Sequence, residues 1–357
     1  MGNREIKRKM RDAKRLVTVS LCSFERLVMN ELLKAEHLSV SFFTDAGEVE
    51  AVRDVSFTVE KGEVLAIVGE SGCGKSALCR SIMKLLPKTA KIKSGKILVN
   101  GADITDYTEK NMSRLRGELF SMVFQDPMTS LNPTITVGKQ IGEAVRIHNK
   151  KMSRGQIRKR VIELMQLVEI DRPEERIRQY PHEFSGGMRQ RAVMAIALAG
   201  DPKILFADEP TTALDVTIQA QILDLIRGLN EQMNTSVLFI THDLGVVSEL
   251  CDTVIVMYTG RIVEKAPVRE LFSDPKHPYT VGLMSAIPRI TKDRPPLETI
   301  EGVVPNPTEQ ISGCSFWPRC PHATEQCKQG EPPVVQLSEE RQVRCWLYAD
   351  AAEKKEG

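Results

Sequence analysis

The sequence predicts an α/β fold built around a parallel β-sheet that is buried on both faces. Short unbroken apolar runs at residues 64–68, 121–124 and 204–207 are typical of strands covered on both sides. Residues 236–240 repeat the pattern. Each run is followed by glycine or by polar side chains, and ligand-binding groups gather at the carboxyl ends of parallel strands. We therefore expect a ligand site at one edge of this sheet.

The clearest motif occupies residues 69–76, which match the phosphate-binding pattern G-x-x-x-x-G-K-S/T. An apolar strand precedes it, and residues 77–86 have a helical pattern that Pro87 stops. The glycines let successive backbone N–H groups face a phosphate, while Lys75 supplies a positive charge and Ser76 a hydroxyl for Mg²⁺. A glycine-rich turn could match by chance, but the strand-to-helix context favours a phosphate site.

Composition limits the class of protein. The chain has 357 residues, 41% of them hydrophobic and 27% charged, which is ordinary for a protein of two or three domains. Its net charge of +2 gives no global argument for binding nucleic acid or a membrane surface. No apolar stretch approaches the roughly 18 residues of a spanning helix. Work at a membrane would therefore require docking to other chains.

The first 30 residues are expected to form a basic, disordered extension ahead of the first strand. Its apolar part at residues 16–22 is short and is not followed by a small-residue cleavage site, which argues against a signal peptide. A start codon assigned too early would produce the same sequence. A weakly amphipathic helix on a membrane surface is the other alternative.

Carboxylates follow a buried-type strand at Asp208 and Glu209. In this position Asp208 can hold Mg²⁺ and Glu209 can orient and polarise an attacking water. The next strand presents His242, a candidate contact to a γ-phosphate, and Gln125 ends the strand at residues 121–124. We expect these side chains to meet at the sheet edge.

A second anion site is predicted where Ser185 precedes Gly186 and Gly187 at the start of an apolar helix. The segment before it is helical and strongly charged, with six Lys and Arg residues at positions 150–160. Because aromatic residues are not interleaved with these charges, we expect a solvated helix face rather than a nucleic-acid patch.

Taken in order, residues 69–76, Gln125, residues 185–190, residues 208–209, residues 213–215 and His242 resemble the motif set of an ABC-type ATPase domain. The resemblance implies a RecA-like core, an antiparallel β subdomain and a helical subdomain at about residues 130–200. It also implies two such domains that sandwich two ATP molecules head to tail. Phe184 opens the signature sequence where leucine is commoner, and we do not take this as loss of activity.

The resemblance implies roles for individual residues. Glu209 would be the general base and His242 would hold the γ-phosphate and water. Ser76, Gln125 and Asp208 would bind Mg²⁺. The implied ATP-binding residues are Phe42, Gly69, Ser71, Gly72, Cys73, Gly74, Lys75, Ser76, Ala77 and Gln125. The residues implied to act in trans, across a dimer interface, are Ser185, Gly186, Gly187, Gln190 and Asp215.

A second resemblance covers nearly the whole chain. Residues 180–191, residues 275–280 and a cysteine-bearing tail are similar to the ATPase subunits of oligopeptide, dipeptide and nickel importers. This resemblance implies that the chain forms a heterodimer with a sister ATPase beneath two membrane permease subunits, at the cytoplasmic face of the membrane. An extracytoplasmic solute-binding protein would feed the system, and no nucleic acid takes part.

The tail carries Cys314, Cys320, Cys327 and Cys345, four of the eight cysteines. Their spacing, C-x5-C-x6-C-x17-C, is wider than that of most zinc sites and favours an iron–sulfur cluster. Some importer ATPases of the resembled group carry [4Fe–4S] here. Zn²⁺ and free thiols are the alternatives.

We expect an ATPase domain at residues 31–265 and a small, loop-rich, cysteine-containing domain at residues 266–357. The predicted function is an ATPase that energises peptide import through closure of the ATPase dimer. Nickel or another small solute could be the cargo instead. A soluble ABC ATPase of another class and a P-loop kinase are further alternatives, but a kinase would leave residues 185–187 and His242 unexplained.

Overall fold

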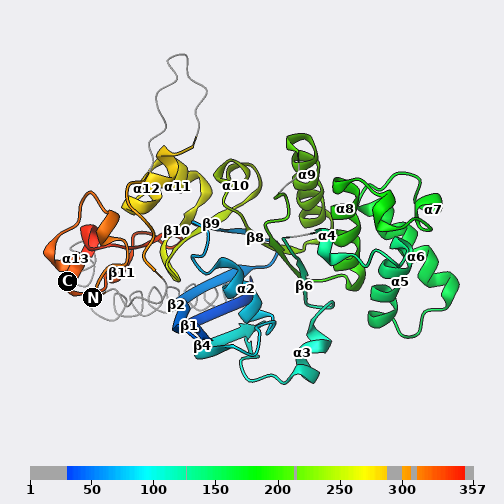
Figure 1. Ribbon diagram of the computed structural model, residues 1–357, viewed down its shortest axis with the longest axis horizontal. Helices are drawn as coiled ribbons and strands as arrows, with labels where there is room; N and C mark the ends of the chain where they lie inside the picture. The colour runs from blue at the N-terminus through cyan, green and yellow to red at the C-terminus, as the bar shows by residue number, and fades with distance from the viewer. Residues whose placement is uncertain (1–29, 126, 213–214, 288–299, 307–311, 350–357) are drawn as a thin grey trace, which may run out of the picture.

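The computed structural model describes residues 30–125, 127–212, 215–287, 300–306 and 312–349. Two sheets and a group of helices make up the described chain (Figure 1). The smaller sheet is antiparallel, in the order β2-β1-β4-β5. Its strands are β1 (Glu31–Thr44), β2 (Gly47–Glu60), β4 (Ala90–Val99) and β5 (Ala102–Asp103).

The larger sheet has the order β11-β12-β10-β9-β3-β8-β7-β6. Strands β9, β3, β8, β7 and β6 are mutually parallel, whereas β10, β12 and β11 continue the sheet with antiparallel pairing. The strands are β3 (Val64–Val68), β6 (Phe120–Val123), β7 (Ile204–Asp208), β8 (Ser236–Ile240), β9 (Thr253–Tyr258), β10 (Arg261–Pro267), β11 (Val334–Gln336) and β12 (Gln342–Arg344). The predicted buried parallel sheet is therefore confirmed.

The parallel strands alternate between two apolar clusters, which explains why they are apolar throughout. Leu205 and Phe239 pack with the helices that follow β6, while Phe206 and Leu238 pack with the antiparallel sheet and α2. A third cluster joins β9 to the C-terminal region through Tyr258 and other aromatic side chains. The core is thus continuous from the sheet into the tail.

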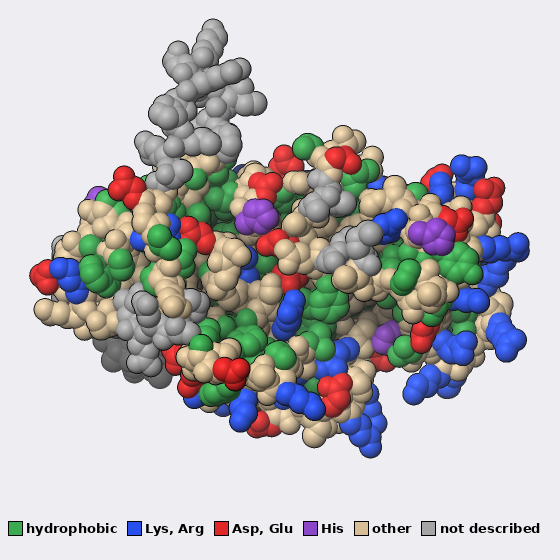
Figure 2. Space-filling model, in the orientation of Figure 1, with side chains coloured by type: hydrophobic (Ala, Val, Ile, Leu, Met, Phe, Trp, Pro, Cys, Tyr) green, Lys and Arg blue, Asp and Glu red, His purple; other side chains and the backbone are tan. Residues whose placement is uncertain are grey.

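The helices are α2 (Lys75–Ile82), α3 (Glu109–Leu115), α4 (Pro127–Ser130), α5 (Val137–His148), α6 (Arg154–Leu167), α7 (Pro173–Arg176), α8 (Gly186–Ala197), α9 (Val216–Met233), α10 (Leu244–Leu250), α11 (Val268–Ser273), α12 (Pro278–Ser285) and α13 (Glu325–Gln329). Helices α5 to α8 lie at the end of the molecule opposite α13 and β11 (Figure 1). Lys and Arg side chains gather over that helical end, where most of the charged run at residues 150–160 is exposed (Figure 2). Among the described residues, no helix has the length and apolarity needed to cross a membrane.

The first strand starts at Glu31, and β2 pairs with β1 from Gly47, so the turn between them is confined to Asp45 and Ala46. One sequence-based boundary was wrong. Helix α2 ends at Ile82, before Pro87. Lys84 adopts a left-handed φ of 51°, and the Leu85 N–H bonds back to the Arg80 carbonyl at 2.7 Å, which closes the helix.

The tail is less separate than a small loop-rich domain would be. Val343 of β12 pairs with Glu264 of β10, so residues from the expected second domain extend the main sheet. The loop-rich character is confirmed for the rest of the tail, where α13 has five residues and every other helix or strand after residue 312 in the described chain has three. The boundaries at residues 30/31 and 265/266 stay a prediction.

Candidate functional site

Four parallel strands end side by side and bring most of the predicted groups to one edge of the sheet. The chain leaves β3 into the loop at residues 69–76, β7 ends at Asp208, β8 is followed by His242, and β6 is followed by Gln125. In the ladder, Asp208 lies opposite Ile240 and Val123 lies opposite Ala207, so the strand ends are level. The arrangement expected from the apolar runs is the one observed.

The loop at residues 69–76 curls around the ammonium group of Lys75. This side chain is only 6% exposed, and its Nζ donates to the carbonyls of Gly69 at 2.7 Å and Glu70 at 3.0 Å. Gly74 caps α2 with φ 103°, and a Cβ there would collide with the carbonyl oxygen of Ala51. The geometry therefore requires glycine at this position. A phosphate arriving at the start of α2 would meet free N–H groups and the lysine together.

Ser76 and Asp208 form a pair suited to Mg²⁺. The Ser76 Oγ donates to Asp208 Oδ1 at 2.8 Å, and the Arg80 guanidinium lies 3.9 Å from Oδ2. Asp208 is 1% exposed, and Oδ2 has no hydrogen-bond partner among the described residues. Burial raises the pKa of Asp208 above its ordinary value, and the Ser76 hydrogen bond offsets part of that shift. A buried carboxylate oxygen without a donor is costly unless a cation joins it, so these residues fit a magnesium ion.

Glu209 lies where three strand ends converge. Its Oε2 accepts hydrogen bonds from Gln125 Nε2 and Thr212 Oγ1, both at 2.9 Å, and its Oε1 lies 3.4 Å from His242 Nδ1. Glu209 has a left-handed φ of 48°, a conformation that costs a non-glycine residue energy and is commonly found at functional sites. The carboxylate is held in place and faces the same edge as the phosphate loop. It can accept a proton from a water molecule there.

Other predicted site residues lie apart from this centre. Phe42 is half-buried against the antiparallel sheet, and Ser185 caps α8 by accepting from the Met188 N–H at 3.3 Å. Asp215 caps α9 by accepting from the Ile218 N–H at 2.9 Å. Gln190 is buried, with neither polar side-chain atom hydrogen-bonded among the described residues. Residues 213–214 lie outside the described residues, and the roles predicted in trans stay predictions.

Sequence reasoning missed several contributors. Thr212 holds Glu209, and Arg80 faces Asp208. Arg80 occupies the α2 face that points back to β7, so helical spacing from Ser76 could have found it. Tyr279 and Arg319 contact the phosphate loop from more than 200 residues away in sequence. No local pattern signals contacts over that separation.

The four tail cysteines share one neighbourhood without forming a coordination shell. The Cys314 N–H donates to the Cys327 carbonyl at 2.8 Å. Burial raises the pKa of Cys345 to about 11, and repulsion from Cys314, Cys320 and Cys327 adds to the shift. Within the described residues, however, no group of three or more His, Cys, Asp or Glu side chains is placed to hold a metal ion. The donor chemistry fits thiolate ligation, while the side-chain geometry does not yet form such a site.

A phosphate loop with its lysine, a buried aspartate paired to the loop serine, and a glutamate poised over the same edge define a P-loop nucleotide hydrolase. Comparison with known families narrows this class. Residues 52–212 match the ABC transporter family, and residues 263–327 match the oligopeptide/dipeptide transporter C-terminal region.

Curated relatives align along nearly the whole chain. The oligopeptide transport ATP-binding protein OppD of Bacillus subtilis is 50% identical over 330 residues, which cover 92% of each chain. The dipeptide transport ATP-binding protein DppD of the same organism is 49% identical and covers 91% of this chain and 97% of the relative. The chain therefore belongs to the oligopeptide/dipeptide group of ABC transporter ATP-binding proteins, and it is an ATPase.

Solved structures agree on the ATPase part. The ATP-binding cassette MJ0796, solved as a dimer bound to ADP and phosphate, superposes with a TM-score of 0.60 at 27% identity and covers 67% of this chain and 99% of that one. The cbiO1 protein of Clostridium perfringens, part of the ABC transporter complex cbiONQ, has a TM-score of 0.60 at 30% identity. The match covers 69% of this chain and 92% of cbiO1.

Proposed function

We propose that this chain hydrolyses ATP to energise the import of dipeptides or oligopeptides across the cytoplasmic membrane. The observation that carries the proposal is the joining of an ATPase site and a peptide-transporter-type C-terminal region in one chain. Relatives named for oligopeptide and dipeptide transport match both parts. Nickel or another small solute is the alternative cargo, because the ATPase does not itself contact what is transported.

The residues of the sheet edge divide the chemistry among them. The N–H groups of the loop from Gly69 to Ala77 and the Lys75 ammonium bind the phosphates, and Phe42 stacks on the base. Ser76, Asp208 and Gln125 would hold Mg²⁺, which would neutralise phosphate charge. Glu209 takes a proton from water as the water oxygen bonds to the γ-phosphorus. The bond from the γ-phosphorus to the β–γ bridging oxygen breaks at the same time, and ADP leaves with that oxygen. His242 orients the water and the γ-phosphate.

One chain supplies only part of the site. Ser185 and Gly186 are exposed at the start of α8, and the N–H groups there form a second anion-binding terminus. In a head-to-tail dimer this terminus would close over the ATP held by a sister ATPase, with Gly187, Gln190 and Asp215 contributing to the same interface. The similar cassette MJ0796 was solved as a dimer bound to ADP and phosphate, which supports dimer formation. Closure of the dimer then drives transport.

The groove beside Gln125 is the proposed docking place for a permease subunit. It has a volume of about 840 Å³ and lies between the sheet edge and the helical end, lined by Phe124, Gln125 and Ile147 among others. Phe124 and Ile147 are 41% and 59% exposed, so the groove presents two large apolar side chains to solvent. Because Gln125 also hydrogen-bonds Glu209, an occupant of this groove contacts a residue that positions the general base. Docked on a permease subunit in this way, this chain would act at the cytoplasmic face of the membrane.

We further propose that Cys314, Cys320, Cys327 and Cys345 hold a [4Fe–4S] cluster, with Zn²⁺ as the alternative. Their shared neighbourhood and thiolate chemistry support this, and the cluster would fasten a loop-rich tail. Iron and acid-labile sulfide assays on anaerobically purified protein test it. A colourless, iron-free sample loaded with zinc would overturn the cluster.

The test of the main proposal is reconstitution. The chain, its sister ATPase, two permease subunits and the binding protein are placed in liposomes, and ATP-dependent uptake of labelled dipeptide, tetrapeptide and Ni²⁺ is measured. We expect peptide uptake that Lys75→Ala abolishes. Uptake of Ni²⁺ alone would select the alternative cargo, and a lone homodimer bound to nucleic acid would overturn the transport role.

A further inference from the structure

The tail contacts the phosphate loop directly through an ion pair. Arg319 Nη1 donates to Glu70 Oε2 at 2.8 Å, and Arg319 Nη2 donates to Glu70 Oε1 at 3.1 Å. This is the bidentate geometry in which arginine binds carboxylates most strongly. Glu70 is the second residue of the loop at residues 69–76. Arg319 lies 249 residues further along the chain, immediately before Cys320.

Arg319 is fixed in place by residues of the tail and by Tyr258 of β9. Its side chain is 4% exposed, and its guanidinium carbon lies 5.9 Å from the ring centre of Tyr258 and 6.0 Å from that of Phe316. Its Nε donates to the Glu301 carbonyl at 3.1 Å. Such a guanidinium has little freedom to follow Glu70 if the loop moves, so the tail determines where the Glu70 carboxylate lies.

Glu70 is in turn linked to the phosphate-binding lysine. Its carbonyl accepts from Lys75 Nζ at 3.0 Å, and its N–H donates to the hydroxyl of Tyr279 at 2.9 Å. Tyr279 is fully buried and follows His277, the N-cap of α12. The tail therefore contacts Glu70 twice: Arg319 binds its carboxylate, and the hydroxyl of Tyr279 accepts from its backbone N–H.

Charge makes the side-chain contact matter for nucleotide binding. A carboxylate inside a loop that binds phosphates repels the ligand unless it is neutralised. Glu70 is only 28% exposed in its side chain, so water screens it incompletely. Among the described residues, the cation that pairs with it is Arg319.

We propose that Arg319 is a positioning residue for MgATP. By neutralising and holding Glu70, it lets the cysteine-bearing tail set the affinity of the phosphate loop for nucleotide. This inference rests on the proposed ATP site, and it assigns to the tail a role in ATP binding beyond fastening the C-terminal chain.

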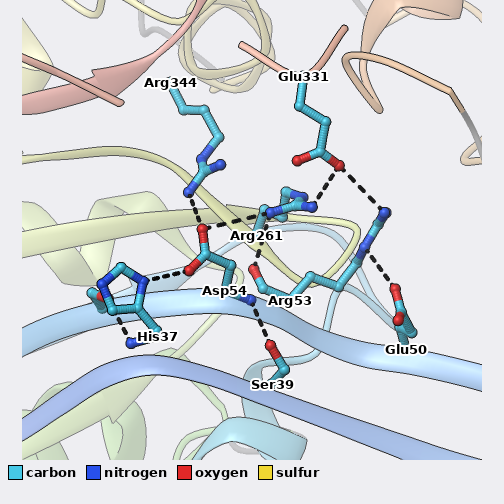
Figure 3. A network of polar contacts seen from close by, with 9 residues as sticks. His37, Ser39, Glu50, Arg53, Asp54, Arg261, Glu331 and Arg344 are labelled. Carbon is cyan, nitrogen blue, oxygen red and sulfur yellow. Dashed lines mark hydrogen bonds and ion pairs between the residues drawn. The ribbon is translucent and has the colours of Figure 1, made fainter. Parts of the chain in front are cut away.

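A second arginine of the tail provides a matched control. Arg344 immediately precedes Cys345, as Arg319 precedes Cys320. Its Nη2 donates to Asp54 Oδ2 at 3.2 Å, beside an ion-pair network of Glu331 with Arg261 and Arg53 on β10 and β2 (Figure 3). The side chains of Arg319 and Arg344 are 4% and 11% exposed, and both join the tail to the ATPase part, but the network around Arg344 does not include the phosphate loop.

The experiment measures MgATP affinity of the full chain by calorimetry, with thermal unfolding recorded for each variant. Lys75→Ala serves as the control in which MgATP binding is lost. We expect Arg319→Ala to weaken MgATP binding about tenfold, the scale of a charge-assisted bidentate pair. Arg319→Lys keeps the charge and should lose about threefold. Arg344→Ala should bind MgATP like the wild type.

The double variant Glu70→Gln/Arg319→Ala distinguishes the proposed role from general damage to the tail. Removing the carboxylate together with its partner should restore affinity to within about threefold of the wild type, because Tyr279 still holds the loop backbone. Equal weakening by Arg344→Ala, or no recovery in the double variant, would overturn the proposal. Wild-type protein that fails to bind MgATP would instead overturn the proposed function.

Discussion

Carboxylates at the sheet edge beside the phosphate loop, here called the ATP edge, differ from a buried carboxylate beside the tail in how fully the chain satisfies them. At the ATP edge, Asp208 has an oxygen without a hydrogen-bond donor in the described chain, and Glu209 sits in a strained backbone conformation. Where the tail packs on β10, Glu264 is fully buried and satisfied: it accepts from the backbone N–H groups of Lys276 and His277 and from Arg341. The first site is incomplete without a ligand, whereas the second is complete within the chain. Changes at the first should therefore affect chemistry, and changes at the second should affect stability.

The largest expected effect is at Glu209. Glu209→Gln keeps the shape that Gln125 and Thr212 hold but removes the base, so we expect ATP hydrolysis by the assembled transporter to fall about thousandfold. MgATP binding and thermal unfolding should match the wild type. An unchanged turnover rate would remove Glu209 from the role of general base.

Glu264→Ala should lower the stability of the fold. It leaves the buried Arg341 charge without its carboxylate and leaves two backbone N–H donors without an acceptor. We therefore expect a loss of about 3 kcal/mol in the free energy of unfolding. Denaturant unfolding of the full chain measures this, with exposed Glu340→Ala as the control. If the Glu264 variant unfolds like the control, the tail does not depend on this buried cluster.

We expect the protonation of His277 to make the stability of the fold depend on pH, with an effect of intermediate size. Burial lowers its pKa to about 3, so the folded protein keeps it neutral while the unfolded chain protonates it near its ordinary pKa of 6.5. The unfolded state thus binds more protons between these values, and stability falls as pH falls through that window. From pH 7 to pH 5 this costs about 2 kcal/mol.

His277→Asn tests that assignment. Asparagine can still cap α12, as His277 does by accepting from the Tyr279 N–H at 3.1 Å, but it does not titrate. We expect the variant to lose less stability than the wild type between pH 7 and pH 5. Identical pH profiles would show that acid sensitivity arises elsewhere.

The smallest expected effect is at Asp215, which separates a structural role from one at a dimer interface. Asp215→Ala removes the cap of α9 and should lower stability by about 1 kcal/mol, while Asp215→Asn keeps the cap. If Asp215 also acts in trans, the Asn variant will hydrolyse ATP more slowly at wild-type stability. Wild-type hydrolysis by the Asn variant would leave capping as its role.

The sequence predicted the ATP edge well because its information is local. A buried strand, a glycine loop and a helix follow one another at residues 64–82, and parallel pairing then places Asp208, His242 and Gln125 beside them. Strand ends are marked by an abrupt change from apolar to polar residues, so each was found within a residue or two.

The tail could not be predicted in the same way. Strands β11 and β12 have three residues each, too few for an alternating pattern, and the contacts of Arg319 and Arg344 span 249 and 290 residues. Residues 275–280 carry a resemblance to importer ATPases, but their local pattern predicts no contact. The structure gives them a physical role, because Lys276 and His277 bind Glu264 while Tyr279 holds the phosphate loop.

We propose that this chain binds ATP by itself but needs a sister ATPase to hydrolyse it. The most direct test compares the isolated chain, shown to be monomeric by light scattering, with the assembled pair at saturating MgATP. We predict comparable nucleotide affinity but hydrolysis about a hundredfold slower in the monomer, since in the proposed head-to-tail dimer the sister ATPase supplies a helix N-terminus that the monomer lacks. A monomer that hydrolyses ATP at the rate of the pair would contradict the account.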